Sequence, residues 1–504
     1  MKRTVIVLSI ALAAIAPSLA HAAGDIPGFQ TGSCNYPAGR ALPGSSGNVL
    51  HVPSGAYPTI QSAVNAAVTG DEVLIAAGTY SENNDGAGTH WTGAIDQRKY
   101  LAQVVVHTPG LLIRGASRSG TILTSVEPKR DSHGTIVVDP DGLNESNFDV
   151  GILVDVDDVV VENLTVHNFQ HHGVYWDNVT GYWGRYLTAY NEGDYGVFAF
   201  GSRCGDFSYS YASGSPDSGF YIGECFPCDA VIHNVDAEEN ALGYSGTNAG
   251  GNLVLRDSIW NNNGIGISPS SLDSEARPPQ RGLTIMNNII DNNNNRTAPG
   301  LGIQAAFWGL GIVIPGGVGN MIMGNEVRDN AIVGIVLAPI PDRNVYIPSG
   351  NTVWGNTVQH DAALFPESID LAQGASSGPN NCWADNDIGP SGTTAPPAPV
   401  LTTVWNCDVV IPQEVPAGTW VTPPGGDARI EYKLALDYVG SQVQPGGFPA
   451  VHAPVVGNVG GDERLSSPWQ TWPAPTCSSH ANSCVDAPNN GAIASWLPSL
   501  GLGA

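Results

Sequence analysis

The stretch Gly-Val-Tyr-Trp at residues 173–176 returns as Gly-Val-Phe-Ala at 196–199 and as Gly-Phe-Tyr-Ile at 219–222. Around these copies, glycines at positions 151, 173, 196, 219, 243 and 264 recur with gaps of 22, 23, 23, 24 and 21 residues. A nearly constant period of this length, with β-prone residues after each glycine, predicts a solenoid whose turns stack on one another. We therefore predict an all-β protein built as a parallel β-helix.

Stacked turns bring equivalent residues within about 4.8 Å of one another, so the sequence predicts columns of side chains. Strand alternation sends the residue after each glycine inward and the next one outward. The predicted inward column is Ile152, Val174, Val197, Phe220, Tyr244 and Ile265, and the outward column is Leu153, Tyr175, Phe198, Tyr221, Ser245 and Gly266. We expect Tyr175, Phe198 and Tyr221 to bind sugar rings; stacking that stiffens the sheet is the alternative.

Ionisable residues stand two positions before several glycines, on the same predicted outward face. This row consists of His171, Asp194, Asp217, Ala241 and Asn262. Two carboxyl groups on adjacent turns cannot both ionise freely, which prepares an acid and a base for glycosidic-bond chemistry. The candidate catalytic residues are therefore Asp194, Asp217 and His171. Capping of backbone N–H groups and calcium binding are alternative roles for the two aspartates.

The ends and the charge of the chain limit its location and partners. Met1-Lys2-Arg3, an apolar run over residues 5–15 and Ala20-His21-Ala22 predict a signal peptide and a secreted protein, extracellular or periplasmic. A net charge of −26 argues against nucleic acid and anionic membranes as partners. It also argues against a free polyanionic substrate unless calcium bridges the two, so the cofactor stays unknown with calcium as the candidate. We expect a monomer.

Eight cysteines in an exported protein predict disulfide bonds. Cys204 and the Cys225/Cys228 pair occupy similar places in consecutive turns, so we expect Cys204 to bond to Cys225 or Cys228. Cys382 with Cys407, and Cys477 with Cys484, are expected local pairs. Redox chemistry or zinc binding is the alternative for Cys225 and Cys228.

The second half of each turn also repeats. Segments beginning at Val254, Ile285, Ile322 and Val353 align without gaps. Three residues past these segments stand Asn262, Asn293, Asn330 and Asp361. Stacked asparagine side chains can hydrogen-bond from turn to turn, so we predict a structural ladder at this bend.

A helix is predicted over residues 57–68, with Ile60, Val64 and Val68 on one face. The stretch Tyr-Pro-Thr-Ile-Gln-Ser-Ala-Val-Asn-Ala-Ala (57–67), with Gly-Asp-Glu-Val-Leu-Ile (70–75) and Gly-Thr-Tyr (78–80), resembles the N-terminal cap of the pectin-lyase-like proteins. The resemblance covers roughly residues 48–390 and implies a right-handed parallel β-helix with an N-terminal helical cap and an irregular C-terminal region. It implies no single activity, because this superfamily holds lyases, hydrolases, epimerases and non-catalytic members.

The better-known catalytic motifs of that superfamily are missing. The sequence has no Gly-His-Gly, Arg-Ile-Lys or Asn-Thr-Asp of the polygalacturonase-like hydrolases and no Asp-Pro-His-Asp of the alginate epimerases. A pectate-lyase-like mechanism needs a basic residue beside calcium. Arg185 and Arg203 are the nearest candidates, and neither falls in the predicted outward columns.

These observations predict four segments: a signal peptide (1–22), an N-terminal segment with the cap (23–100), the β-helix (101–390) and a Pro/Gly-rich C-terminal region (391–504). The favoured function is a secreted protein acting on extracellular polysaccharide in the manner of a glycoside hydrolase. A calcium-dependent polysaccharide lyase and a non-catalytic glycan-binding surface or adhesion protein are the alternatives. Loss of function on neutralising carboxylates would indicate hydrolysis, and dependence on the aromatic residues alone would indicate binding.

Overall fold

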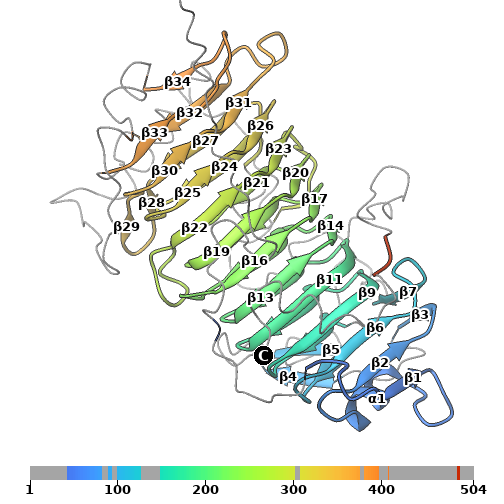
Figure 1. Cartoon of the computed structure of the whole chain (residues 1–504). Coiled ribbons are helices and arrows are strands. Elements are labelled where there is room, and N and C mark those ends of the chain that lie inside the picture. Colours follow the sequence, from blue (N-terminus) through green and yellow to red (C-terminus); the bar gives the residue numbers. More distant parts are fainter. Residues whose placement is uncertain are drawn as a thin grey trace, which may run out of the picture.

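The computed structural model describes residue 34, residues 42–81, 89–92, 99–125, 148–300, 307–374, 380–396, residue 407 and residues 485–487. Parallel strands stack along one axis in the order of the chain (Figure 1). None of the helices in this part of the chain is long and apolar enough to cross a membrane. The predicted all-β parallel β-helix is confirmed.

One wall of the helix is a twelve-stranded sheet, which we call the glycine sheet. Its strands are β4 (Thr89–Thr92), β5 (Lys99–Val106), β8 (Val150–Val154), β10 (His172–Asp177), β12 (Tyr195–Phe200), β15 (Ser218–Gly223), β18 (Leu242–Ser245), β21 (Ile265–Ser268), β24 (Leu310–Pro315), β27 (Val333–Ala338), β32 (Ile369–Gln373) and β34 (Thr394–Ala395). All neighbours pair in parallel except β4 and β5, which pair antiparallel. The sheet therefore carries one strand from almost every turn.

The rest of each turn belongs to a twenty-stranded sheet that is bent into two faces. The first face holds β1 (Val49–Val52), β2 (Glu72–Ile75), β6 (Leu112–Gly115), β13 (Arg203–Ser208), β16 (Ala230–His233), β19 (Gly250–Arg256), β22 (Arg281–Met286), β25 (Met321–Met323), β30 (Thr352–Trp354) and β33 (Cys382–Ala384). The second face holds β3 (Gly78–Tyr80), β7 (Thr121–Thr124), β14 (Tyr211–Ser213), β17 (Asp236–Glu238), β20 (Ile259–Asn261), β23 (Ile289–Asp291), β26 (Glu326–Arg328) and β31 (Thr357–Gln359). The long strands β9 (Val159–His167) and β11 (Thr180–Tyr190) run through both faces. A small antiparallel pair, β28 (Ile340–Pro341) with β29 (Val345–Tyr346), lies outside these sheets.

The bend between the two faces is made by one residue per turn with positive φ. These residues are Asn163, Tyr186, Tyr209, Asn234, Asp257, Asn287, Gly324, Gly355 and Asp385, with φ between 50 and 64°. Asn, Asp and Gly adopt this left-handed conformation most readily. Seven of the nine bend residues are of these types, and Tyr186 and Tyr209 are the exceptions.

Asparagine ladders line the bends inside the helix. They run through Asn288, Asn325, Asn356 and Asn386, through Asn240, Asn263, Asn293 and Asn330, and through Gln280, Asn320, Asn351 and Asn381. The prediction is confirmed for Asn293 and Asn330 and wrong for Asn262 and Asp361. Leu255, not Val254, pairs with Ile285, which puts Asn263 in the ladder. Asp361 instead binds the Asp329 carboxylate through its backbone N–H.

Glu192 lies at the same bend as the ladder that begins with Asn240, in a turn nearer the N-terminus. Its side chain is buried, and Oε2 accepts the Phe169 N–H at 2.8 Å. Burial raises the pKa of this carboxyl well above its usual value, although the Phe169 N–H lowers it. The folded protein therefore holds this proton more tightly than the unfolded chain does.

Replacing Glu192 by glutamine should stabilise the protein at pH 8 and leave its stability at pH 4 unchanged. The folded pKa is raised, so stability falls by about 1.4 kcal/mol per pH unit once pH exceeds the unfolded value, and glutamine removes this loss. Glu162→Gln is the matched control, because Glu162 is equally buried but binds Arg114 and Arg185. That change should destabilise the protein by about 3 kcal/mol or more. Melting temperatures of the two variants, measured against pH, test this prediction. The same change in melting temperature for both variants would contradict it.

The glycine column is confirmed, with one correction. A Cβ on Gly151, Gly173, Gly196, Gly243, Gly266, Gly311 or Gly334 would lie 2.4–2.7 Å from a backbone carbonyl oxygen of the next turn. The sixth member is Gly266 and not Gly264, because Leu242 pairs with Ile265 and Tyr244 with Ile267. The glycines are therefore required by the close approach of neighbouring turns.

Gly196→Ala should destabilise the protein by about 1–3 kcal/mol, because the new methyl group would overpack against the next turn. At this position a Cβ would meet the Gly219 carbonyl oxygen at 2.7 Å and Ala212 at 3.1 Å. Gly55→Ala is the control, since a Cβ there meets nothing within 4 Å. Denaturant unfolding of both variants measures the difference. Equal stability of Gly196→Ala and the parent would refute the steric account.

The inward column is confirmed from Ile152 to Tyr244, all within the main core, and continues with Ile267 instead of Ile265. Likewise the outward column continues from Ser245 to Ser268 and not to Gly266. Strand alternation is interrupted at the glycine, because the residue directly before it also lies on the outer face. Leu242 and Ile265 thus pack in an outer cluster, and His172 contacts the Tyr175 ring.

The N-terminal cap is built around α1 (Ile60–Ala66), which begins with a capping box formed by Thr59 and Ser62. Gln61 binds both the N–H and the carbonyl of Val105 in β5, at 2.8 and 2.9 Å. The Gln61 amide thus makes the backbone hydrogen bonds that another strand would make at this edge of the glycine sheet. Ile60 and Val64 are buried as predicted, but Val68 lies beyond the helix and is 59% exposed.

The predicted bond from Cys204 to Cys225 or Cys228 is wrong. Cys204 bonds to Cys34, and Cys225 bonds to Cys228. Cys204 lies in an outer cluster whereas Cys225 and Cys228 lie in the interior, so neighbouring turns do not bring their sulfur atoms together. The predicted Cys382–Cys407 bond is confirmed. Cys477 and Cys484 lie outside the described residues.

A short C-terminal segment, residues 485–487, returns to the first turns of the helix. The buried Arg118 donates its backbone N–H to Asp486 at 2.7 Å and its guanidinium to the Val485 carbonyl at 3.3 Å. The Ala487 N–H binds Asn163 at 2.8 Å. Figure 1 shows this segment in red near β7 and β9.

Candidate functional site

Tyr175, Phe198 and Tyr221 occupy successive strands on the outer face of the glycine sheet, as predicted. They are register partners, and their ring centroids lie 4.5 and 5.0 Å apart. All three are buried, with 0, 5 and 1% exposure, and the Trp91 ring meets Tyr175 edge-on at 6.1 Å. The rings therefore form an aromatic cluster and not an open platform for sugars.

His171, Asp194 and Asp217 lie on consecutive turns at the starts of β10, β12 and β15. Backbone bonds join them, from the Asp194 N–H to His171 at 2.8 Å and from the Asp217 N–H to Asp194 at 3.2 Å. His171 and Asp194 are buried, while Asp217 is half-buried and accepts the Ser245 hydroxyl at 3.1 Å. The structure thus brings the three predicted residues together. Asn262 does not belong to this row, since its N–H binds Asp291.

A neighbouring acid, Glu275, was not predicted. It lies on the 269–280 loop between β21 and β22, and its carboxylate accepts the Tyr221 hydroxyl at 2.9 Å. Burial raises the pKa of Glu275 to about 7, and the negative charges of Glu224 and Asp217 add to this rise. Glu275 is therefore an acid that holds its proton close to neutral pH.

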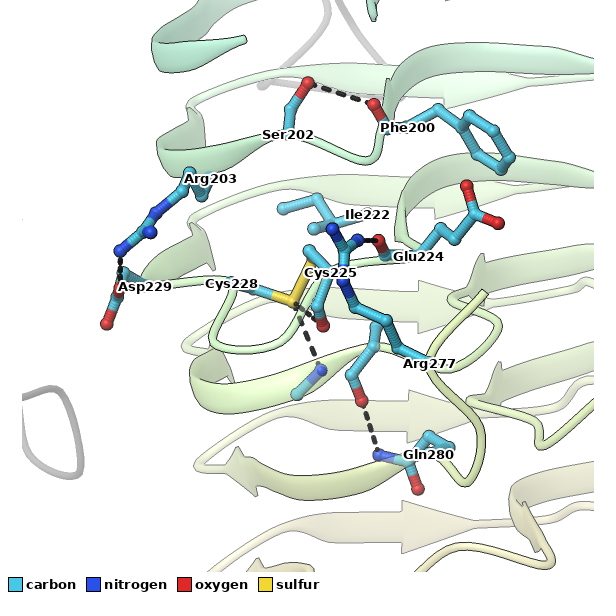
Figure 2. The surroundings of a disulfide bond; sticks show 12 residues. Phe200, Ser202, Arg203, Ile222, Glu224, Cys225, Cys228, Asp229, Arg277 and Gln280 are labelled. Carbon is cyan, nitrogen blue, oxygen red and sulfur yellow. Dashed lines mark hydrogen bonds and ion pairs between the residues drawn. A yellow bond between two sulfur atoms is a disulfide. The ribbon is translucent and has the colours of Figure 1, made fainter. Parts of the chain in front are cut away.

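The loop that carries Glu275 is fixed by the turns beneath it. Asn248 donates to the carbonyls of Leu272 and Glu275 at 2.7 and 3.1 Å. The Glu224 carboxylate binds the Ala276 N–H, and Arg277 binds the Glu224 carbonyl. Figure 2 shows Glu224 and Arg277 beside the Cys225–Cys228 bond. In the sequence, the one sign of this loop is the twelve-residue interval that separates Ser268 from Arg281.

Tyr195 lies among these acidic groups. Burial first, and then the negative charges of Asp217 and Asp194, raise the pKa of its hydroxyl well above the usual value, with smaller contributions from Tyr221 and Glu275. Tyr195 therefore keeps its proton, and its hydroxyl can act as a hydrogen-bond donor.

Two imidazoles and a carboxylate meet at the N-terminal side of this group. His171, His172 and Asp194 each offer one ligand atom, and these atoms lie within 4.8 Å of one another. By contrast, Arg185 binds the buried Glu162 and Arg203 binds Asp229, both on the first face of the other sheet. Neither arginine therefore stands beside the acids of the glycine sheet, where a lyase would need its base.

The model of the family described as "Right handed beta helix region" matches residues 150–339. This chain is a right-handed parallel β-helix protein. The resemblance to the pectin-lyase-like proteins is thereby confirmed for the fold. A comparison with curated proteins finds no match for this β-helix protein.

Solved structures of similar shape include three carbohydrate enzymes. The A-module of a mannuronan C-5 epimerase from Azotobacter vinelandii is 15% identical, covering 66% of this chain and 93% of that chain with a TM-score of 0.44. An alginate lyase from Paenibacillus is 15% identical, covering 69% and 97% with a TM-score of 0.37. DFA-IIIase from Arthrobacter chlorophenolicus without its lid is 11% identical, covering 69% and 99% with a TM-score of 0.45.

Proposed function

We propose that this protein is an exported enzyme that hydrolyses glycosidic bonds in an extracellular polysaccharide, with Glu275 as the general acid and Asp217 as the base. The observation that carries the proposal is the Glu275 carboxyl, whose pKa of about 7 is set partly by Asp217. Glycoside hydrolysis needs two carboxyl groups in opposite protonation states. A protonated Glu275 within electrostatic reach of Asp217 fits that requirement.

Each residue has a distinct task in this mechanism. Glu275 donates its proton to the glycosidic oxygen as the bond to the anomeric carbon breaks. Asp217 accepts a proton from the water that attacks the same carbon, and the Ser245 hydroxyl orients its carboxylate. Tyr221 holds Glu275 in place through its hydroxyl. Asp194, first expected to pair with Asp217, faces His172 instead, with Oδ2 and Nδ1 4.0 Å apart.

The charge of the protein favours a neutral polysaccharide. The chain carries a net charge of −26, and the negative charges of Asp217 and Glu224 act on Glu275 at the site. A polyuronate would be repelled by both. Export is supported by the cysteines, because every cysteine among the described residues is in a disulfide.

A panel of neutral and acidic polysaccharides, each with and without a calcium chelator, tests the proposal. We expect new reducing ends from a neutral substrate, without chelator sensitivity. Unsaturated products from a polyuronate would instead indicate a lyase. Tight binding without cleavage would indicate the glycan-binding alternative, and either result would overturn hydrolysis.

A further inference from the structure

The residues that meet beside the proposed site, His171, His172 and Asp194, are all buried. Their exposed fractions are 7, 1 and 4%, and their ligand atoms lie within 4.8 Å of one another. The two histidines are adjacent at the start of β10, and Asp194 precedes β12 one turn later. Two turns of the solenoid thus supply one cluster of donors.

Two nitrogen donors and one carboxylate oxygen indicate the class of ion. Zinc and related divalent transition metals accept imidazole together with carboxylate, and catalytic zinc sites often have three protein ligands. Calcium instead prefers six to eight oxygen ligands. The calcium role considered for Asp194 therefore fits this cluster poorly, because two of its three donors are nitrogen atoms.

The backbone holds the three residues in register. The Asp149 carbonyl accepts the N–H groups of both His171 and His172, at 2.8 and 3.1 Å. The His171 carbonyl accepts the Asp194 N–H at 2.8 Å, which fixes the aspartate relative to the histidines. Three ligands anchored in this way bind an ion with little loss of backbone freedom.

Aromatic rings fix the orientation of His172. Its ring centroid lies 4.6 Å from Phe198, 5.2 Å from Tyr175 and 5.4 Å from Tyr195. His172 Nδ1 lies 4.0 Å from Asp194 Oδ2, whereas ligands of one tetrahedral zinc ion stand about 3.4 Å apart at bond lengths near 2.1 Å. A bound zinc ion would draw these two atoms about 0.6 Å closer together.

We propose that His171, His172 and Asp194 form a binding site for a divalent transition metal, with zinc as the best-fitting ion and one coordination position left for a further ligand. The site goes beyond the proposed hydrolysis and does not rest on it. It also explains why two histidines and an aspartate are buried together on an otherwise aromatic face.

Metal binding is measured on the full-length protein after treatment with a chelator. Calorimetry with zinc chloride should give about one ion per chain, and calcium chloride should give no binding at this site. His172→Ala and Asp194→Asn should each weaken zinc binding about 100-fold or more. This loss exceeds the one expected from removing a group that only hydrogen-bonds to a metal ligand. His51→Ala is the matched control, because His51 is exposed on β1 and should bind zinc like the parent.

A second measurement on the unaltered protein covers the case in which the variants do not fold. Cobalt substitution should give the absorption bands of a four-coordinate site, and X-ray absorption should show two imidazole ligands. No imidazole ligands, no zinc binding, or undiminished binding by folded His172→Ala would overturn the site. Glu275→Gln should bind zinc like the parent, so failure of the hydrolase proposal and failure of the metal site are distinguishable.

Discussion

Replacing Glu275 by glutamine is expected to lower turnover about 100-fold or more while leaving the fold intact, because glutamine keeps the shape but cannot donate the proton. The parent should lose activity as pH rises through about 7, where Glu275 gives up its proton. The variant should lack this alkaline limb. Turnover against pH on the substrate identified by the polysaccharide panel measures both effects.

The control for Glu275 is Glu367→Gln, a glutamate exposed to solvent on the segment before β32. Its activity should match the parent at every pH. Tyr221→Phe provides a sharper check, because the Tyr221 hydroxyl lowers the pKa of Glu275. Its loss should move the alkaline limb to higher pH. Parental turnover in Glu275→Gln, or a limb that moves to lower pH in Tyr221→Phe, would remove Glu275 from the mechanism.

Val197→Asp should cost several kcal/mol of stability and prevent recovery of folded protein. Val197 is fully buried in the main core, and an aspartate there would be a charge without a partner inside the helix. Soluble yield and the melting temperature measure the effect. Phe220→Asp, one turn later in the same inward column, should behave in the same way.

The matched control is Val68→Asp. Val68 is 59% exposed beyond the end of α1, so an aspartate there stays in water and should change stability by less than about 0.5 kcal/mol. Normal yield and an unchanged melting temperature for Val197→Asp would show that Val197 does not lie in the core.

The repeat could be predicted because its causes are local. Each glycine is needed where the next turn approaches, and Val174, Val197 and Phe220 follow it into the core. The predicted register was wrong where the sequence itself is ambiguous. Gly264-Ile265-Gly266-Ile267 offers two identical frames, and the pairing of Tyr244 with Ile267 shows that the second is used.

The site was less predictable, because its parts come from outside the repeat. Glu275 lies on a loop that belongs to no periodic segment, and its pKa depends on Glu224 and Asp217 from other turns. His171, Asp194 and Asp217 were found because they precede periodic glycines. Burial of the aromatic column was missed because alternation gives the face of a strand and not what covers it.

Two long-range links among the described residues make the ends of the solenoid unequal. The Cys34–Cys204 bond spans 170 residues, and the contact of Arg118 with Asp486 spans 368, and both hold the N-terminal turns. The Cys382–Cys407 bond at the far end closes only 25 residues. In a stack whose turns touch only their neighbours, opening begins where the fewest contacts must break. Among the described residues, the two long links hold only N-terminal turns, so we expect the rod to open first at its C-terminal turns.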